Sequence, residues 1–314
     1  MEKIFQKLSF SSASLVLIVL IGIFITLFSA AKPAIDEFGL HFLVDPTWNK
    51  EVPIETANTQ VPTAQVSDDI IDEDEMILDE DEESLTKTIY GGLVPIVGTI
   101  LSTLIALAFA LPIAMGISVF LAEIASKTIS KFVGMAIELL AAIPSIIFGM
   151  WGLYYFAPII SEAFGGYQVS LLTAGLVLGV MILPFMAAIT RDSMNTTPDV
   201  LKESAYALGA TKFEVVKDII FPYSKVGIIG SIILALGRAL GETMTVAFLI
   251  GAVYSLPEKI TDPTISIPVA MAVNFGEASG LGESALFYLG LILFVMSFII
   301  ISVAKFYFLK RVKL

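Results

Sequence analysis

Cysteine is absent from this 314-residue sequence, and His41 is its only histidine. The chain therefore has no disulfide, no thiolate nucleophile and no cysteine-containing metal site. It also contains no Gly-x-x-x-x-Gly-Lys-Ser/Thr pattern, the loop that cradles ATP phosphates in P-loop proteins. Its apolar stretches hold no Asp pair, no Ser-Lys or Ser-His pair and no histidine cluster of the kind an intramembrane enzyme uses. We expect no enzymatic activity, cofactor, metal ion or nucleic-acid partner.

Charged residues are scarce as well. They make up 15% of the chain against 56% apolar residues, and the mean hydropathy is +0.88, which is too apolar for a soluble domain of this length. A helix needs about 20 neutral residues to cross the hydrocarbon core of a bilayer. Six stretches qualify, and none alternates like a transmembrane β-strand. They lie between Lys7 and Lys32, Lys87 and Glu123, Lys131 and Glu162, Glu162 and Arg191, from Val226 to Pro257, and between Glu283 and Lys305.

The first apolar stretch raises two alternatives. Lys3 and Lys7 precede it and Ser29, Ala30 and Ala31 follow it, a pattern that also suits a cleaved signal peptide. The stretch is long for a signal peptide, so we expect a membrane helix surrounded by lipid. With the N-terminus in the cytoplasm, most of the 18 Lys and Arg residues fall on the cytoplasmic side. This bias predicts that both termini are cytoplasmic.

The net charge of −12 comes mainly from one region. Residues 1–33 form the N-terminus and first helix, residues 34–88 an acidic extracytoplasmic loop, and residues 89–314 the remaining five helices. The acidic run Asp68–Glu83 cannot bury enough apolar surface to fold, so we predict a flexible, solvated insertion. A cation site or a docking surface are the alternatives. The run lacks the glycine and terminal glutamate spacing of an EF-hand loop, which disfavours calcium.

The predicted cytoplasmic loop 191–225 carries the clearest local signals. Thr197 can cap a helix that has Pro198 at its first position and ends at Gly209. Thr211 and Glu214 have the spacing of a capping box for a second short helix. Pro222 is expected to stop that second helix before the next membrane segment. Two short helices separated by a glycine would form a protrusion that another protein can grip.

This loop resembles the signature of permease subunits in binding-protein-dependent ABC importers. That signature reads Glu-Ala-Ala, three residues, Gly, nine residues, Ile, one residue, Leu-Pro. The matching residues are Glu203, Ser204, Ala205, Gly209, Ile219, Phe221 and Pro222, where Ser204 replaces Ala and Phe221 replaces Leu. The resemblance implies that the first short helix couples the chain to a separate ATPase subunit. That partner agrees with the missing P-loop.

Two charges stand inside the fifth apolar stretch. Arg238 is predicted about 18 Å along its helix, near the bilayer middle, where a guanidinium must face protein or water. Glu242 follows at i+4 and is expected on the same helix face. The two side chains could simply neutralise each other and brace the helix. Alternatively Arg238 binds an oxyanion, because its planar fork matches phosphate oxygens, and Glu242 holds the fork when the anion is absent.

The stretch Gly237–Met244 resembles helix five of the membrane subunits of phosphate-specific ABC importers, in which Gly-Arg-Ala-x-Gly-Glu-Thr recurs. Further matches are Asp45–Asn49, Tyr90–Val94, Ile143–Gly149 and Trp151–Leu153. The resemblance implies a substrate pathway past Arg238, Glu242 and Thr243. Residues from about Val52 to Ser84 depart from the family pattern, and an acidic mouth there should repel phosphate. We expect that segment to lie aside or to contact a binding protein.

The prediction is therefore an all-α integral membrane protein of six transmembrane helices. One extra N-terminal helix precedes a five-helix core of the type I ABC importer kind. The resemblance implies a phosphate permease in a bacterial inner membrane, with a second permease subunit, two ATPase subunits and an extracytoplasmic phosphate-binding protein as partners. Permeases for sulfate, molybdate or phosphonate are the nearest alternatives. A secondary anion transporter or a channel would leave the cytoplasmic signature without a purpose.

Overall fold

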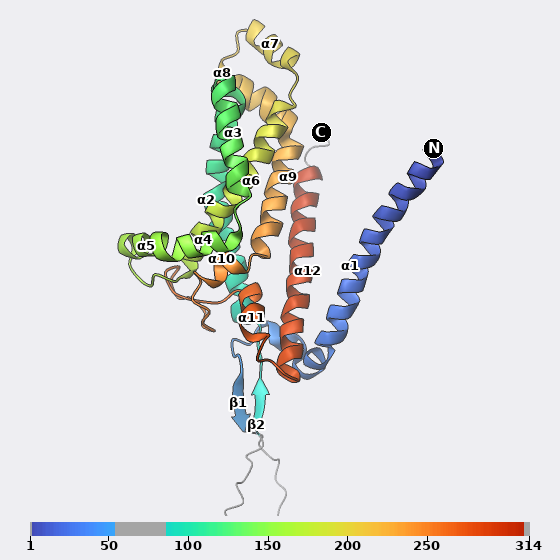
Figure 1. Cartoon of the computed structure of the whole chain (residues 1–314), viewed down its shortest axis with the longest axis vertical. Helices are drawn as coiled ribbons and strands as arrows, with labels where there is room; N and C mark the ends of the chain where they lie inside the picture. The colour runs from blue at the N-terminus through green and yellow to red at the C-terminus, as the bar shows by residue number, and fades with distance from the viewer. Residues whose placement is uncertain (1, 54–85, 311–314) are drawn as a thin grey trace, which may run out of the picture.

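The computed structural model describes residues 2–53 and 86–310 as an elongated helical bundle with a small two-stranded sheet at one end (Figure 1). Six helical segments of these residues are long and apolar enough to cross a membrane, as predicted. The elements are α1 Glu2–Phe38, β1 Lys50–Pro53, β2 Thr86–Ile89, α2 Leu93–Val119, α3 Lys127–Ala141, α4 Ser145–Trp151, α5 Ala157–Phe164, α6 Leu171–Asn195, α7 Asp199–Ala207, α8 Lys212–Glu214, α9 Phe221–Leu240, α10 Met244–Ala247, α11 Ile267–Asn274 and α12 Leu281–Lys310.

Helix α6 lies at the centre of the bundle and packs along α2. Both helices are apolar nearly all round, which fits burial among other helices rather than on a surface. A Cβ on Gly175 or Gly179 of α6 would lie only 2.7 Å from Ile105 or 2.8 Å from Phe109 of α2. Glycine therefore lets the two backbones approach closely, as small residues do between helices in lipid.

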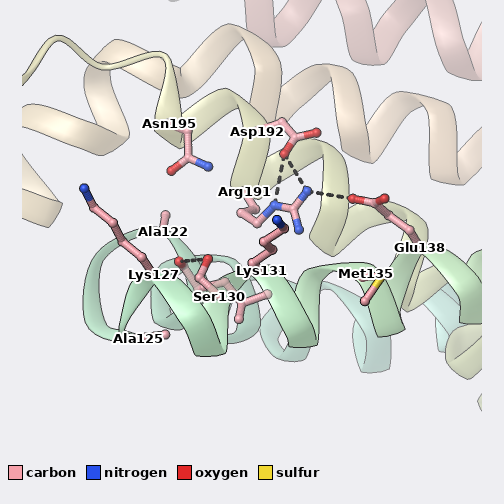
Figure 2. A pocket seen from close by; sticks show the side chains of 11 residues that line it. Ala122, Ala125, Lys127, Ser130, Lys131, Met135, Glu138, Arg191, Asp192 and Asn195 are labelled. Carbon is pink, nitrogen blue, oxygen red and sulfur yellow. Dashed lines mark hydrogen bonds and ion pairs between the residues drawn. The ribbon is translucent and has the colours of Figure 1, made fainter.

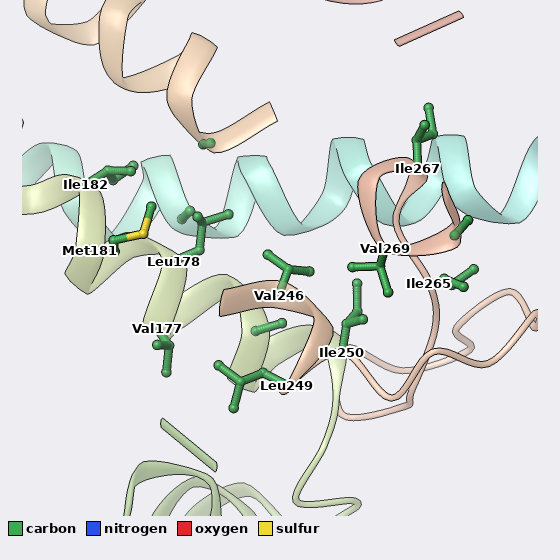
Figure 3. Packing of buried hydrophobic residues seen from close by; sticks show 14 of the residues in the cluster. Val177, Leu178, Met181, Ile182, Val246, Leu249, Ile250, Ile265, Ile267 and Val269 are labelled. Carbon is green, nitrogen blue, oxygen red and sulfur yellow. The ribbon is translucent and has the colours of Figure 1, made fainter. Parts of the chain in front are cut away.

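The same core continues into the short helices at mid-bundle. Side chains of α6 meet apolar residues of α10, of the chain that follows it, and of α11 (Figure 3). Ile250, Ile265 and Ile267 are fully buried there, although they come from a largely irregular segment. Packing against α2 and α6 holds this irregular segment in place. The buried residues labelled in the figure are Val177, Leu178, Met181, Ile182, Val246, Leu249, Ile250, Ile265, Ile267 and Val269.

Helix α1 is longer than predicted and reaches Phe38 with Pro33 inside it. Near its C-terminal end it packs on α12, and toward its N-terminus it diverges from the bundle (Figure 1). Phe42, just beyond the helix, is fully buried and stacks on Tyr288 at 4.6 Å between ring centroids. The segment after α1, predicted to be extracytoplasmic, therefore begins with packed structure. The predicted flexible stretch falls mostly on residues 54–85, outside the described residues.

The third predicted membrane segment, between Lys131 and Glu162, is not one helix. Helix α3 runs along the bundle and ends at Ala141, whereas α4 and α5 run across its long axis (Figure 1). The break comes at Pro144, which lacks a backbone N–H and disfavours helical geometry at Ile143 before it. The third segment that is long and apolar enough to span is Ser145–Phe164.

Candidate functional site

Arg238 lies in the last turn of α9. The helix begins at Phe221, so Arg238 is about 26 Å along it, further than predicted. In Figure 1 this end of α9 lies part-way along α12 rather than at either end of the bundle. The side chain is exposed, and among the described residues it makes no hydrogen bond or ion pair. It is thus an unpaired cation within the length of the bundle.

Glu242 does not lie one turn further along the same helix. Helix α9 ends at Leu240, and Glu242 follows in an irregular connection to α10, so the prediction of a shared helix face is wrong. Gly241 weakens the helix at this point because glycine is a poor helix former. The Glu242 carboxylate instead accepts a hydrogen bond from the Thr245 N–H at 3.1 Å, which caps the start of α10.

Thr243 and its neighbours hold this connection against α4. The Thr243 hydroxyl donates to the Gly241 carbonyl at 3.4 Å, and the buried Thr245 hydroxyl donates to the Ser145 carbonyl at 2.8 Å. Gly149 of α4 permits the contact, since a Cβ there would lie 2.8 Å from the Phe248 ring. The three predicted pathway residues therefore come together where α9, α10 and α4 meet.

The glycines beside Arg238 are not packed as tightly as those of α6. A Cβ on Gly237 would meet Ile301 at an ordinary 3.4 Å, and one on Gly241 would meet only the Gly237 carbonyl, at 3.8 Å. The face next to Arg238 has space around it.

Helix α7, which carries Glu203, Ser204 and Ala205, protrudes at one end of the bundle (Figure 1). None of its residues is buried. Gly209 follows it with φ +89°, a left-handed conformation that suits glycine and ends the helix as predicted. Leu208 is 89% exposed and Phe213 73% exposed. The protrusion therefore exposes large apolar side chains among its polar ones.

The start of α7 differs from the prediction. Pro198 rather than Thr197 is the capping residue, and it makes no side-chain hydrogen bond to the helix. Thr197 is buried, and its hydroxyl has no hydrogen-bond partner among the described residues. A threonine one position too early cannot direct its oxygen at the first free N–H groups of the helix.

The second short helix is capped as predicted. Thr211 accepts a hydrogen bond from the Glu214 N–H at 3.4 Å, and the Glu214 carboxylate accepts from the Thr211 N–H and hydroxyl at 2.7 Å each. The hydrogen bond from the Thr211 backbone, helped by that from its hydroxyl, lowers the pKa of Glu214 below its usual value. The capping box fixes the chain direction after the left-handed Gly209.

Pro222 does not stop this helix, so that prediction is wrong. The chain remains helical from α8 through a wider π-helical turn, Val215–Ile220, into α9. The Phe221 N–H bonds to the Val216 carbonyl five residues back, and Pro222 lies in the first turn of α9, where no N–H is needed. Ile219, Ala205 and Gly209 line a hollow of about 330 Å³ between α7 and this helix.

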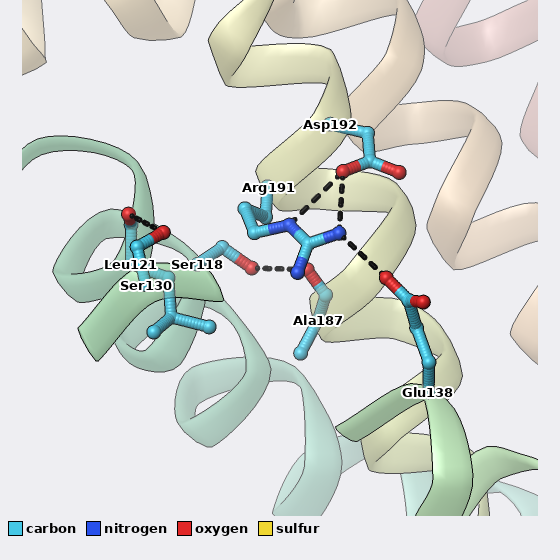
Figure 4. Close-up of polar contacts among 7 residues, drawn as sticks. All are labelled: Ser118, Leu121, Ser130, Glu138, Ala187, Arg191 and Asp192. Atoms are coloured by element: carbon cyan, nitrogen blue, oxygen red, sulfur yellow. Dashed lines mark hydrogen bonds and ion pairs between the residues drawn. The ribbon is translucent and has the colours of Figure 1, made fainter. Parts of the chain in front are cut away.

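A charged cluster at the same end of the bundle was missed by the sequence reasoning. Arg191 of α6 is 12% exposed and donates to Asp192 at 2.8 and 2.9 Å and to Glu138 of α3 at 3.0 Å (Figure 4). It borders a cavity of about 610 Å³ whose lining includes Lys127 and Lys131 (Figure 2). Gly134 of α3 leaves room for the guanidinium, because a Cβ there would collide with it.

Comparison with known proteins gives one family. Residues 114–314 match the family described as "Binding-protein-dependent transport system inner membrane component". Similar proteins include the phosphate transport system permease protein PstC of Haemophilus influenzae, 38% identical over 97% of this chain and 92% of that protein. The protein of the same name from Mesorhizobium japonicum is 36% identical over 99% of this chain and 90% of its own length. That from Pasteurella multocida is 44% identical over 69% of this chain and 74% of its own.

Solved structures support the architecture. An inward-facing conformation of the MetNI methionine ABC transporter matches 69% of this chain and 90% of its own with a TM-score of 0.50. The sequences are 20% identical over that match, so the likeness concerns the fold alone.

Proposed function

Because the chain belongs to the family of binding-protein-dependent transport system inner membrane components, we propose that it is the permease subunit of an ATP-driven importer of inorganic phosphate. It is a multi-pass inner-membrane protein. The substrate follows from two independent supports. Relatives that align along nearly the whole chain are phosphate permeases by name, and the chain places an unpaired guanidinium within the bundle.

Arg238 is the observation that carries this proposal. An arginine exposed toward lipid at this depth would cost several kcal/mol, so its face must meet water or another protein. A guanidinium offers two parallel N–H groups to two phosphate oxygens, which a lysine cannot do. The space around Gly237 and Gly241 leaves room for an anion or for a facing subunit.

Glu242 gives the site a means of choosing between oxyanions. One of its carboxylate oxygens accepts the Thr245 N–H, which leaves the other free to accept a hydrogen bond. Hydrogen phosphate carries an O–H that can donate to it, whereas sulfate presents only acceptors and is repelled. A site that hydrogen-bonds a substrate hydroxyl rejects the analogue that lacks it strongly. The Thr243 hydroxyl, whose contact with the Gly241 carbonyl is long at 3.4 Å, would turn to donate to the same anion.

The protrusion at α7 is the proposed ATPase contact. Glu203, Ser204, Ala205 and Gly209 would dock in a groove of the ATPase, with Ile219 and Pro222 holding the second helix in place. An uncovered apolar surface of this kind marks a protein interface. The full complex would contain a second permease like PstA, two ATPases like PstB and an extracytoplasmic phosphate-binding protein like PstS. Both termini would then be cytoplasmic.

The mechanism would be alternating access. ATP binding brings the two ATPases together and displaces α7. The helices connected to it then rock, so that Arg238 faces first the extracytoplasmic side and then the cytoplasm. Residues 34–88 would contact the binding protein or lie aside from the phosphate path.

Uptake of radiolabelled phosphate into vesicles that contain the chain with its co-purified partners tests this proposal. We expect uptake that requires ATP and is competed by arsenate but not by sulfate. Competition by sulfate, molybdate or phosphonate in place of arsenate would assign a different oxyanion. Uptake by an assembled complex without ATP would replace the importer with a secondary transporter or channel.

A further inference from the structure

Lys202 is the one residue of α7 whose side chain reaches back into the bundle to form a short ion pair. Its Nζ lies 2.7 Å from Oε1 of Glu123, and the two side chains are 15% and 9% exposed. Every other α7 residue except Ala205 is exposed. Asp199, a second acid near Lys202, is 3.9 Å away and almost entirely in solvent. Glu123 is therefore the main partner of Lys202, and the pair is shielded from water.

Glu123 lies at the corner between α2 and α3. The corner consists of a π-helical turn, Phe120–Ile124, followed by extended residues that lead into α3. Ser130 of α3 donates to the Leu121 carbonyl at 2.8 Å, which ties the corner to the first turn of α3 (Figure 4). A displacement of the corner therefore carries the start of α3 with it.

Helix α3 leads directly to the proposed anion site. It continues across the break at Pro144 into α4, whose first carbonyl, that of Ser145, accepts the Thr245 hydroxyl. Thr245 in turn donates its N–H to Glu242. These contacts thus connect α7 with Glu242 through the α2–α3 corner, α3 and α4, without passing along α9.

We propose that Lys202 is a positioning residue that transmits the movement of α7 to the anion site through Glu123. The inference rests on the proposed function, since it assumes that an ATPase moves α7. The covalent connection from α7 to α9 passes the left-handed turn at Gly209, and the ion pair is a second connection between α7 and the bundle. A shielded ion pair resists separation because each charge would be left buried without a partner. The ion pair therefore couples the position of α7 to that of the α2–α3 corner.

Charge reversal tests the pair in the reconstituted complex. We expect Lys202→Glu and Glu123→Lys each to raise the ATP hydrolysed per phosphate imported at least fivefold. The double variant, which restores the pair in reverse, should return to within about twofold of the native ratio. A native ratio in both single variants overturns the proposal, as does a double variant no better than the singles. Two single substitutions that destabilise the protein independently would add up in the double variant. Recovery in the double variant therefore indicates that the contact between residues 202 and 123 is responsible.

Lys217→Glu provides the matched control. Lys217 lies on the neighbouring π-helical turn and its contact with Asp218 is long, at 4.0 Å, and solvent-exposed. Reversing an exposed charge of this kind should leave the ratio unchanged. An equal loss of coupling in this control would mean that charge reversal anywhere near α7 disrupts docking, which overturns the specific role of Lys202.

A second readout does not depend on the cargo. Since the chain has no cysteine, Met244→Cys would introduce its only thiol, at an exposed position beside Glu242. The rate at which a maleimide labels this thiol should change when a non-hydrolysable ATP analogue is added. In the Lys202→Glu background the change should disappear. The native complex could show no phosphate uptake but still show a nucleotide response that requires Lys202. That result would contradict phosphate as the substrate and support the coupling of α7 to the anion site. A response that survives Lys202→Glu overturns the route.

Discussion

Helices α6 and α7 are neighbours in the chain and opposites in their surroundings. α6 is buried along most of its length by α2, α3 and α9, and its glycines are pressed against neighbouring side chains. α7 begins four residues later and has no fully buried residue, although α7 and the residue after it carry Val200, Leu201 and Leu208, which are as apolar as the residues of α6. Burial within this chain explains the residues of α6. The exposed apolar residues of α7 have no such explanation within the described part of the chain, and we propose that they meet a surface on another protein.

The two arginines outside the C-terminal tail repeat this contrast. Arg191 is enclosed and bonded to two carboxylates, whereas Arg238 is exposed and unpaired among the described residues. Arg191 is part of the packing of the fold, and Arg238 is the residue that we propose binds the anion. Substitutions in the enclosed set should therefore cost stability, and substitutions in the open set should cost activity in a protein that still folds.

Gly179→Val should have the largest effect on stability because it lies in the tightly packed contact between α2 and α6. The added Cβ would lie 2.8 Å from the Phe109 ring and 3.0 Å from the Ala106 carbonyl, so α2 and α6 must separate. Overpacking of this kind costs roughly 1–3 kcal/mol. Thermal unfolding of the purified protein should show a lower midpoint. Gly116→Val in α2, with nothing within 4 Å, is the control and should unfold close to the native temperature.

Arg238→Lys should separate function from fold. The charge remains but the bidentate fork is lost, so phosphate uptake should fall about tenfold, which corresponds to about 1.4 kcal/mol. Assembly and unfolding temperature should not change. Arg191→Lys should give the reverse profile, a lower unfolding temperature, because it loses hydrogen bonds to Asp192 and Glu138. Native uptake by the Arg238→Lys protein would remove the fork from the mechanism.

Gly209→Val should have the smallest effect of the three, and it should alter only the coupling of ATP hydrolysis to phosphate import. No atom lies within 4 Å of the added Cβ, so the cost arises only from φ +89°, a conformation that a β-branched residue resists by about 1–3 kcal/mol. We expect ATP hydrolysis per imported phosphate to rise a few-fold at unchanged complex yield. Gly209→Asn tolerates the left-handed region better and should lie between native and valine. Equal coupling in all three proteins would contradict a role for this turn.

Local signals in the sequence predicted local structure well. The capping box at Thr211 and Glu214 formed because both partners lie within one helical turn, and Gly209 ended α7 because only its own conformation was at stake. The six apolar stretches were likewise visible without a structure. Thr197 shows the limit, since a shift of one position turned a predicted cap into a buried hydroxyl without a partner.

Non-local contacts decided the remaining features. The end of α9 at Leu240 depends on the contact of α10 with α4. Neither Gly241 nor Glu242 predicts this helix end from the sequence alone. The pairs of Arg191 with Glu138 and of Lys202 with Glu123 join residues far apart in the chain. Such pairs cannot be read from spacing, because helical periodicity reports which face a residue occupies and not which helix meets it.

The small sheet at the far end of the bundle has a consequence for protein engineering. β1 and β2 pair antiparallel with Pro53 opposite Thr86, so the chain leaves the bundle and returns to it at one point. Doubling the length of a loop closed in this way costs only about 0.6 kcal/mol of closure entropy. The hairpin is therefore a suitable insertion site. A fluorescent reporter or affinity domain with adjacent termini can replace residues 54–85 there without displacing α2.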